Sequence, residues 1–179
     1  MTYIEYLTCA EKHLKGCSQL LLSYQQGTKY DNHVWLELYY LSGYIIEGIV
    51  VYSAYKLHNW NSSVDIRNCD LSFTKRTNLD FYYKRPRPSF FQNRPAGALS
   101  VQGHKFQEIA KSLLKPDPSF NDVPYIGNGQ IDSDVERLID DWKPEVRYQY
   151  HGMAGLPTLN QNIIDRLLST CFTIYSKHI

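Results

Sequence analysis

The chain has 179 residues, a formal net charge of +1 and four cysteines. This length favours one domain with a sizeable core over two full domains, and the balanced charge gives no global case for nucleic acid or an acidic membrane as a partner. The cysteines form no C-x-x-C pair and the N-terminus lacks a signal-peptide pattern. We therefore expect a single cytoplasmic domain over residues 1–179 with reduced thiols.

The first predicted helix runs from Tyr3 to Tyr24. Its apolar residues recur at alternating steps of four and three, which places them in one stripe along a helix. These residues are Tyr3, Leu7, Ala10, Leu14, Cys17, Leu21 and Tyr24. Gly27 supplies a stop, and so short a turn to the next helix predicts an antiparallel pair.

The second predicted helix, from Asn32 to His58, is apolar on nearly every side, so other helices must surround it. Glu37 and Glu47 interrupt it, and no uncharged run approaches the roughly 20 residues that a bilayer requires. We expect a central core helix rather than a membrane span. Gly43 and Gly48 each cost about 1 kcal/mol of helix propensity, which predicts a close approach by a neighbouring helix.

Residues 59–98 have no sustained period and contain seven Lys or Arg residues against three Asp. A segment of this length without regular structure is typically functional or mobile, and we interpret it as an insertion. It interleaves cations with aromatic rings, a combination that binds single-stranded nucleic acid. The candidate nucleic-acid-binding residues are Tyr82, Tyr83, Lys84, Arg85, Arg87 and Arg94. The alternatives are a solvated surface loop and a surface for a protein partner.

Three further helices are predicted after the insertion. The third begins around Leu99 and ends at Leu114, before two prolines. A capping-box pattern at Ser133–Glu136 opens a short amphipathic helix that Pro144 ends, and a second capping box at Thr158–Gln161 opens the last helix. The sequence therefore predicts an all-α fold, an up-and-down bundle of four to five helices with a long irregular insertion between the second and third.

Glu47 lies on the apolar central helix, where an ionised carboxylate needs a partner. Arg147 suits bidentate pairing with a carboxylate, so we predict a structural ion pair between Glu47 and Arg147. His104 stands at a predicted helix start, where we expect a capping or packed histidine, with a phosphate ligand as the alternative. The histidines and cysteines have no paired ligand spacing, so we expect no metal site and no cofactor.

Three motifs of this chain, in order, resemble those of the HEPN superfamily of small helical bundles. They are Tyr40–Glu47 in the second helix, Gly103–Phe106 opening the third and Trp142–Tyr148 before the last. The resemblance covers residues 1–58 and 99–179 and implies a bundle that often forms dimers. Members include nucleotide-binding proteins, metal-independent ribonucleases and non-catalytic partners of nucleotidyltransferases in toxin–antitoxin systems.

The resemblance implies a cytoplasmic homodimer with a nucleotide- or RNA-associated accessory role in a toxin–antitoxin or defence system. Its expected partners are a nucleotide or single-stranded RNA and a nucleotidyltransferase, with no membrane association. A rival function is a metal-independent endoribonuclease, in which His151 transfers a proton and Arg147 stabilises the negative charge of the phosphorane. These two residues stand closer in sequence than the corresponding pair in ribonuclease members. A third function is a protein-interaction module that presents the insertion.

Overall fold

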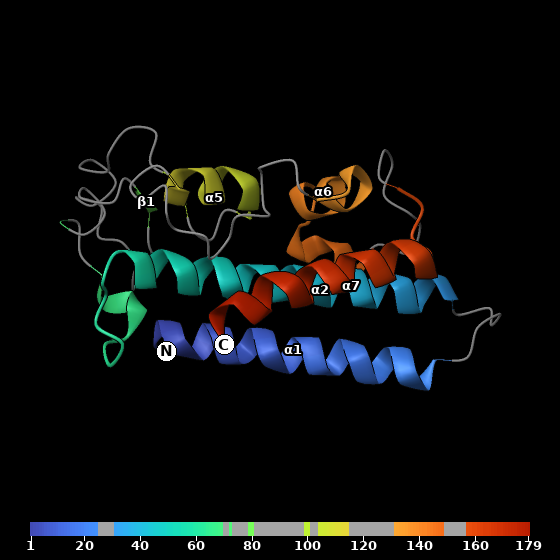
Figure 1. Ribbon diagram of the computed structural model, residues 1–179, viewed down its shortest axis with the longest axis horizontal. Coiled ribbons are helices and arrows are strands. Elements are labelled where there is room, and N and C mark those ends of the chain that lie inside the picture. The colour runs from blue at the N-terminus through green and yellow to red at the C-terminus, as the bar shows by residue number, and fades with distance from the viewer. Residues whose placement is uncertain are drawn as a thin grey trace.

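The computed structural model describes residues 1–24, 31–69, 72, 79–80, 99–100, 104–114, 131–148 and 157–179. The long elements are the helices α1 (Tyr3–Ser23), α2 (Asp31–Leu57), α5 (Phe106–Leu114), α6 (Ser133–Asp140) and α7 (Gln161–Tyr175). Short 3-10 helices are η1 (Ile66–Asn68), η2 (Pro144–Tyr148) and η3 (Ser176–His178). The two-residue strands β1 (Leu79–Asp80) and β2 (Leu99–Ser100) pair in parallel. The fold is an all-α bundle, which confirms the predicted class (Figure 1).

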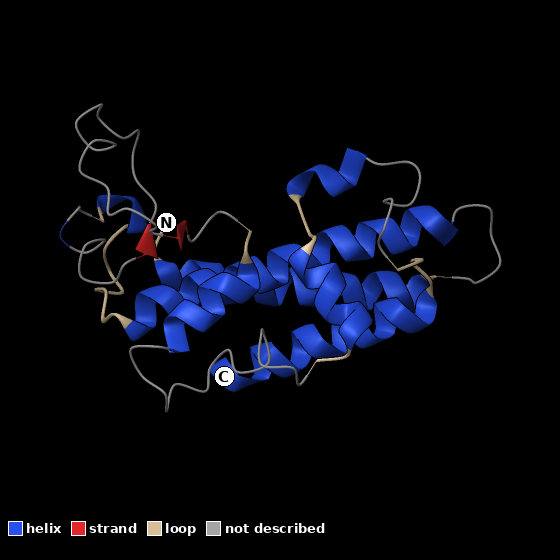
Figure 2. Ribbon diagram, turned by 90° about the horizontal axis from the view of Figure 1, so that it is seen from above, coloured by secondary structure: helices blue, strands red, loops and turns tan. Residues whose placement is uncertain are grey.

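Helix α2 lies at the centre of this bundle and contacts α1, α5, α7 and η2. Helices α5 and α6 lie on the side of α2 opposite α1 (Figure 1), and α1 and α2 run along the long axis of the molecule (Figure 2). Every residue from Ile45 to Tyr55 is buried, which confirms the prediction of a central helix surrounded by others. By length and composition α2 could also cross a membrane, and 61% of its most apolar 18-residue window is buried inside the bundle.

The two glycines of α2 lie where neighbours approach its backbone closely. A Cβ atom on Gly48 would stand 2.7 Å from the carbonyl oxygen of Tyr6 and 3.1 Å from the Cβ of Ala10, both on α1. A Cβ atom on Gly43 would stand 1.9 Å from the indole of Trp142. The predicted approach of a helix is therefore confirmed at Gly48, whereas at Gly43 the neighbour is an aromatic side chain that follows α6.

The predicted caps of the last two helices were displaced by one or two residues. Asp132, rather than Ser133, caps α6, and its side chain accepts hydrogen bonds from the backbone N–H groups of Asp134 and Val135. Likewise, the side chain of Asn160, rather than that of Thr158, accepts the cap hydrogen bond of α7. Asp and Asn are strong caps because their short side-chain oxygens reach the free N–H groups of the first turn.

The third long helix begins later than predicted, at Phe106 instead of around Leu99. His104 has a φ of 55°, which a right-handed helix cannot include. Leu99 belongs to the short strand pair. The later start places His104 in the turn before α5, where its ring contacts α2 and the segment after α6.

The described first part of the predicted insertion folds back on the end of α2. The ring of Trp60 lies 5.9 Å from that of Tyr55 in an edge-on contact, and Ile66 and Cys69 are buried. The six candidate nucleic-acid-binding residues lie outside the described residues, as does His151. Their predicted roles therefore stay predictions.

Candidate functional site

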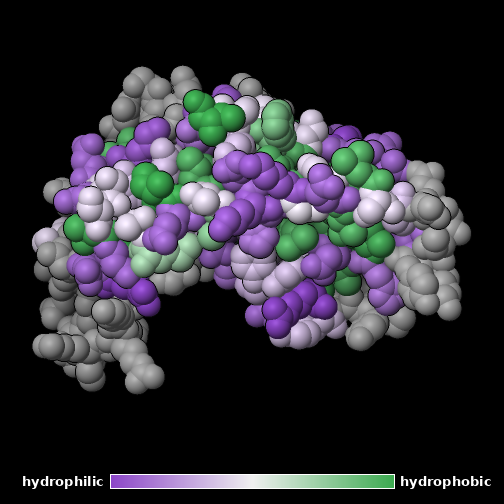
Figure 3. All heavy atoms as spheres, turned by 90° about the horizontal axis from the view of Figure 1, so that it is seen from below, coloured by the Kyte–Doolittle hydropathy of each residue, from purple (hydrophilic) through white to green (hydrophobic). Residues whose placement is uncertain are grey.

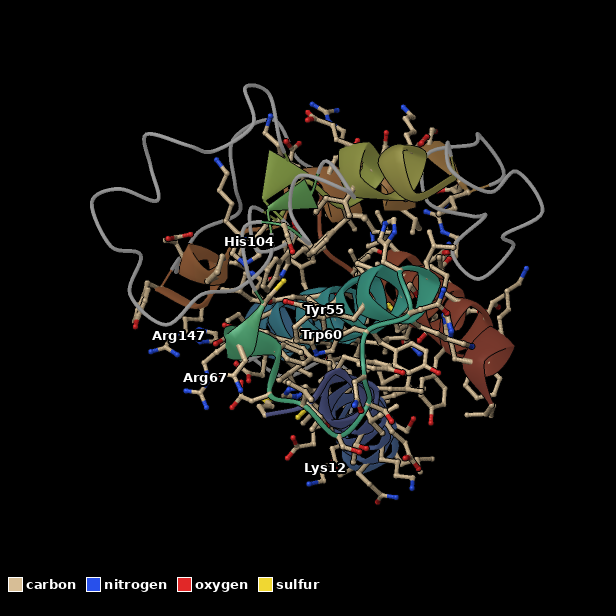
Figure 4. The ribbon with its side chains drawn as sticks, turned by 90° about the vertical axis from the view of Figure 1, so that its left-hand side faces the viewer. Lys12, Tyr55, Trp60, Arg67, His104 and Arg147 are labelled. Atoms are coloured by element: carbon tan, nitrogen blue, oxygen red, sulfur yellow. The ribbon has the colours of Figure 1, made fainter. Side chains whose placement is uncertain are left out.

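One face of α2 gathers polar and aromatic side chains from all three motifs identified in the sequence. Tyr40, Tyr44 and Glu47 follow one another at steps of four and three residues, so they share this face. The turn before α5 and the segment from Trp142 through η2 add the remaining members. We call this set the α2 polar face: Tyr40, Tyr44, Glu47, His104, Trp142, Arg147 and Tyr148. His104 and Arg147 lie on the same side of the bundle, with Arg147 pointing outward (Figure 4).

Trp142 holds the face together from within. Its side chain is buried, and its indole Nε1 donates a hydrogen bond of 3.2 Å to the backbone carbonyl of Tyr40. The centroid of its ring lies 5.0 Å from that of Tyr44 and 5.2 Å from that of His104, edge-on in both cases. The indole fits this close to α2 because Gly43 has no side chain. Trp142 thereby holds the Tyr44 ring and the His104 ring on the same side of α2.

Arg147 lies at the exposed end of the face. One guanidinium nitrogen donates a hydrogen bond of 3.2 Å to the Tyr40 hydroxyl, and another donates to the hydroxyl of Tyr148. The Cζ atom lies 4.5 Å from the centroid of the Tyr148 ring, a cation–π contact. These hydrogen bonds, that to Tyr40 foremost, raise the pKa of Arg147. Among the described residues no carboxylate lies within ion-pairing distance of it.

The predicted ion pair between Glu47 and Arg147 is therefore wrong. Glu47 is nearly buried, and its Oε2 atom lies 3.6 Å from Nε2 of His104. Because 3.6 Å is too long for a hydrogen bond, the carboxylate and the imidazole lie side by side without one. The sequence indicated that Glu47 needs a partner. It did not indicate that the turn before α5 brings His104 closer than Arg147.

The hydroxyls of Tyr40 and Tyr44 form a second polar pair, which sequence reasoning missed. Their oxygens lie 3.1 Å apart. Burial, the hydrogen bond with Tyr40 and the nearby carboxylate of Glu47 together raise the pKa of Tyr44 to about 12, against the opposing effect of Arg147. The raised pKa of Tyr44 means that its hydroxyl is protonated at neutral pH. The i, i+4 spacing of two tyrosines on a helix is the signal that could have revealed the pair.

His13 of α1 packs against the Tyr44 ring of this pair. Its ring stacks on that of Tyr44, with the centroids 5.7 Å apart. Burial lowers the pKa of His13, so its imidazole is neutral at physiological pH. His13 therefore adds packing to the face and no cation.

The face combines three chemical capacities. Arg147 and the tyrosine hydroxyls are hydrogen-bond donors suited to an anion. His104 and Glu47 can accept protons or hydrogen bonds. The Tyr148 ring, from a residue that is 67% exposed, can stack against a planar group. In the described part of the chain no group of three or more His, Cys, Asp or Glu side chains could hold a metal ion.

Two other surfaces are weaker candidates. A shallow pocket on α7, beside the cap residue of α6, contains Arg166, but this cation is already paired with Asp132 at 2.7 Å and Asp134 at 3.6 Å. On the α1 side, apolar side chains are scattered among hydrophilic ones rather than forming one continuous area (Figure 3). The α2 polar face is thus the strongest candidate among the described residues.

No protein-family model, curated protein or solved structure shows a significant match to this chain. The assignment of the site therefore rests on its geometry and chemistry. The resemblance to the HEPN superfamily stays a prediction, as does the catalytic pair of Arg147 and His151.

Proposed function

We propose that the protein binds a nucleotide or single-stranded RNA on the α2 polar face. The observation that carries this proposal is the Arg147 guanidinium, which lies over the exposed Tyr148 ring. Within the described ranges this cation has tyrosine partners and no carboxylate partner. A cation beside an aromatic ring suits nucleic acid because the guanidinium binds phosphate while the ring stacks on a base.

The resemblance to HEPN proteins supports the same proposal. Its three motifs lie far apart in the sequence, yet the polar face takes members from each of them. In this proposal the chain is a cytoplasmic, homodimeric accessory protein of a toxin–antitoxin or defence system. A nucleotidyltransferase is its proposed protein partner.

The proposal is tested by equilibrium filter binding of a single-stranded RNA of about ten nucleotides, a length typical of one binding module. Arg147→Gln should weaken binding about tenfold, because a charge-assisted contact to phosphate is lost. Lys12→Gln is the matched control, since it removes an exposed cation that points away from the face (Figure 4). Equal losses in the two variants, or no binding by the unaltered protein to RNA and nucleotides, would overturn the proposal.

The contact between His104 and Glu47 favours a second candidate function, metal-independent RNA cleavage. A carboxylate 3.6 Å from an imidazole can orient it for proton transfer once substrate binding shortens the contact to a hydrogen bond, and Arg147 lies on the same face to stabilise negative charge. Cleavage of RNA in EDTA that His104→Ala abolishes would support this function with His104 as the proton-transfer group. Cleavage lost only in His151→Ala would instead assign the pair of Arg147 and His151, and no cleavage would exclude both.

A further inference from the structure

We propose that Arg147 and the hydroxyl pair of Tyr40 and Tyr44 form a binding site for a single phosphate group. The inference rests on the proposed function and deepens it by naming the ligand group and the atoms that hold it. It assigns a ligand-binding role to two tyrosines that otherwise read as packing residues of α2.

The first argument is a count of hydroxyl protons. Tyr40 and Tyr44 have one each, and the single hydrogen bond between them uses one. Arg147 can only donate, so its bond to the Tyr40 hydroxyl uses a lone pair and no proton. Whichever tyrosine donates to the other, one proton is left over. In the described part of the chain neither hydroxyl contacts a further acceptor, so this proton is available to a ligand.

The second argument is the span between the donors. A nitrogen of Arg147 lies 3.2 Å from the Tyr40 oxygen, which lies 3.1 Å from the Tyr44 oxygen. The Tyr44 oxygen is therefore no farther from that nitrogen than these two distances combined. Two oxygens of one phosphate are about 2.5 Å apart, and a hydrogen bond of about 2.9 Å on either side reaches across this span. One phosphate can thus contact the guanidinium and the spare hydroxyl proton together.

The third argument is the distribution of charge along α2. The guanidinium of Arg147 is the cation at one end of the polar face. Glu47 is the opposing charge and lies one turn beyond Tyr44, where His104 faces it. An anion is therefore favoured at the Arg147 end. The raised pKa of Tyr44 keeps its hydroxyl protonated, and hence a possible donor, throughout the neutral range.

The test is a titration of the full chain with inorganic phosphate, in which phosphorus NMR measures binding at each step. The double variant Tyr40→Phe with Tyr44→Phe keeps both rings against Trp142 and removes only the hydroxyls. We expect this variant to bind phosphate about tenfold more weakly than the unaltered protein, and Lys12→Gln to bind it equally well. The single variant Tyr44→Phe provides the comparison if the double variant melts at a lower temperature.

Phosphate affinity unchanged by removal of the hydroxyls, or no phosphate binding by the unaltered protein, would overturn the inference. The RNA-binding measurement distinguishes this failure from failure of the proposed function. RNA binding that the double variant retains in full would refute the phosphate site alone. Hydroxyl-dependent phosphate binding without any RNA or nucleotide binding would refute the proposed function alone.

Two RNAs of the same sequence, one with a 5′-phosphate and one with a 5′-hydroxyl, distinguish a terminal phosphate from an internal phosphodiester as the ligand. The affinity of the protein for each RNA is measured by filter binding. A preference for the 5′-phosphate that disappears in the double variant would support the site and assign it to a terminal monoester. An equal loss of affinity for both RNAs would support the site and assign it to an internal phosphodiester.

Discussion

Single glycine residues decide how closely neighbouring segments approach the backbone of α2. Gly43 makes room for the Trp142 indole, and Gly48 makes room for the α1 backbone. Gly16 of α1 has nothing within 4 Å of its would-be Cβ. The three glycines therefore stand in similar helical conformations with very different surroundings.

This contrast predicts opposite effects of the same substitution on the free energy of unfolding. Gly43→Ala and Gly48→Ala should each destabilise the protein by about 3 kcal/mol, because the added methyl group overlaps packed atoms. Gly16→Ala should stabilise it by up to about 1 kcal/mol through helix propensity. Urea unfolding measures all three. Destabilisation by Gly16→Ala as large as that by Gly43→Ala would contradict the packing described here.

Asp140 at the end of α6 provides a residue whose charge opposes folding. Its side chain is exposed, but nearby protein atoms partly desolvate the carboxyl group, and together with the carboxylates of Glu136 and Asp141 they raise its pKa from 3.8 to about 6. A carboxyl group with a raised pKa stabilises the fold below its unfolded pKa, and this contribution is lost as the pH rises through the folded pKa. Asp140→Asn should therefore raise the melting temperature at pH 7 but not near about pH 3.5. Equal gains at both pH values would contradict the raised pKa.

Glu47 lies against His104 instead of the predicted Arg147, which shows the limit of sequence reasoning for a single residue. An acid on an apolar helix requires a partner, and that much was predicted correctly. The identity of the partner depends on the left-handed backbone of His104, which turns the chain into α5. A residue other than Gly in this conformation has no strong sequence signal. The tyrosine pair did have a signal, because its spacing is visible in the sequence.

At the scale of the elements, long helices were predictable and their ends were less so. The period of α1 and the all-round apolarity of α2 predicted their cores and their bounds within a few residues. The starts of α6 and α7 matched capping patterns, but the residue that caps each helix precedes or follows the predicted one. Two or more candidate cap residues among Ser, Thr, Asp and Asn stand within two positions of each other at both starts, so composition alone does not select the cap.

The start of α7 allows the true cap to be distinguished from the predicted one. The Asn160 side chain accepts a hydrogen bond of 3.1 Å from the Ile163 backbone N–H. Asn160→Ala should destabilise the protein by about 1 kcal/mol, whereas Thr158→Ala, an exposed residue two positions earlier, should change stability by a few tenths. Thermal unfolding of both variants measures the difference. A larger effect at Thr158 would restore the predicted cap.

At the scale of the whole molecule, the arrangement of the bundle explains why one face of α2 can serve a ligand. Helix α2 is buried along most of its length by α1, α5 and α7, but on the side of Tyr40, Tyr44 and Glu47 it also meets the turn before α5 and the segment that contains Trp142. The side chains of Tyr40 and Tyr44 are only partly covered there, whereas Glu47 is buried. The fold class and this central helix followed from hydrophobicity, whereas the meeting of distant segments on one face required the structure.

The predicted insertion should add electrostatic attraction to the ligand face. Replacing Lys84, Arg85 and Arg87 with Gln removes three cations from a segment whose charge is positive. RNA affinity should then fall, and its dependence on salt should become shallower, by a slope of about two if all three contact phosphate. Filter binding across a series of salt concentrations measures the slope. An unchanged slope would show that these cations do not contact the RNA.

The position of Trp142 also gives the protein an intrinsic optical reporter. Its indole is shielded from solvent and stands beside Tyr40 and Tyr44, so a ligand that shifts the Arg147 end changes its electronic surroundings. With Trp35 and Trp60 replaced by Phe, the emission spectrum of the remaining indole would follow occupancy of the face without any added label.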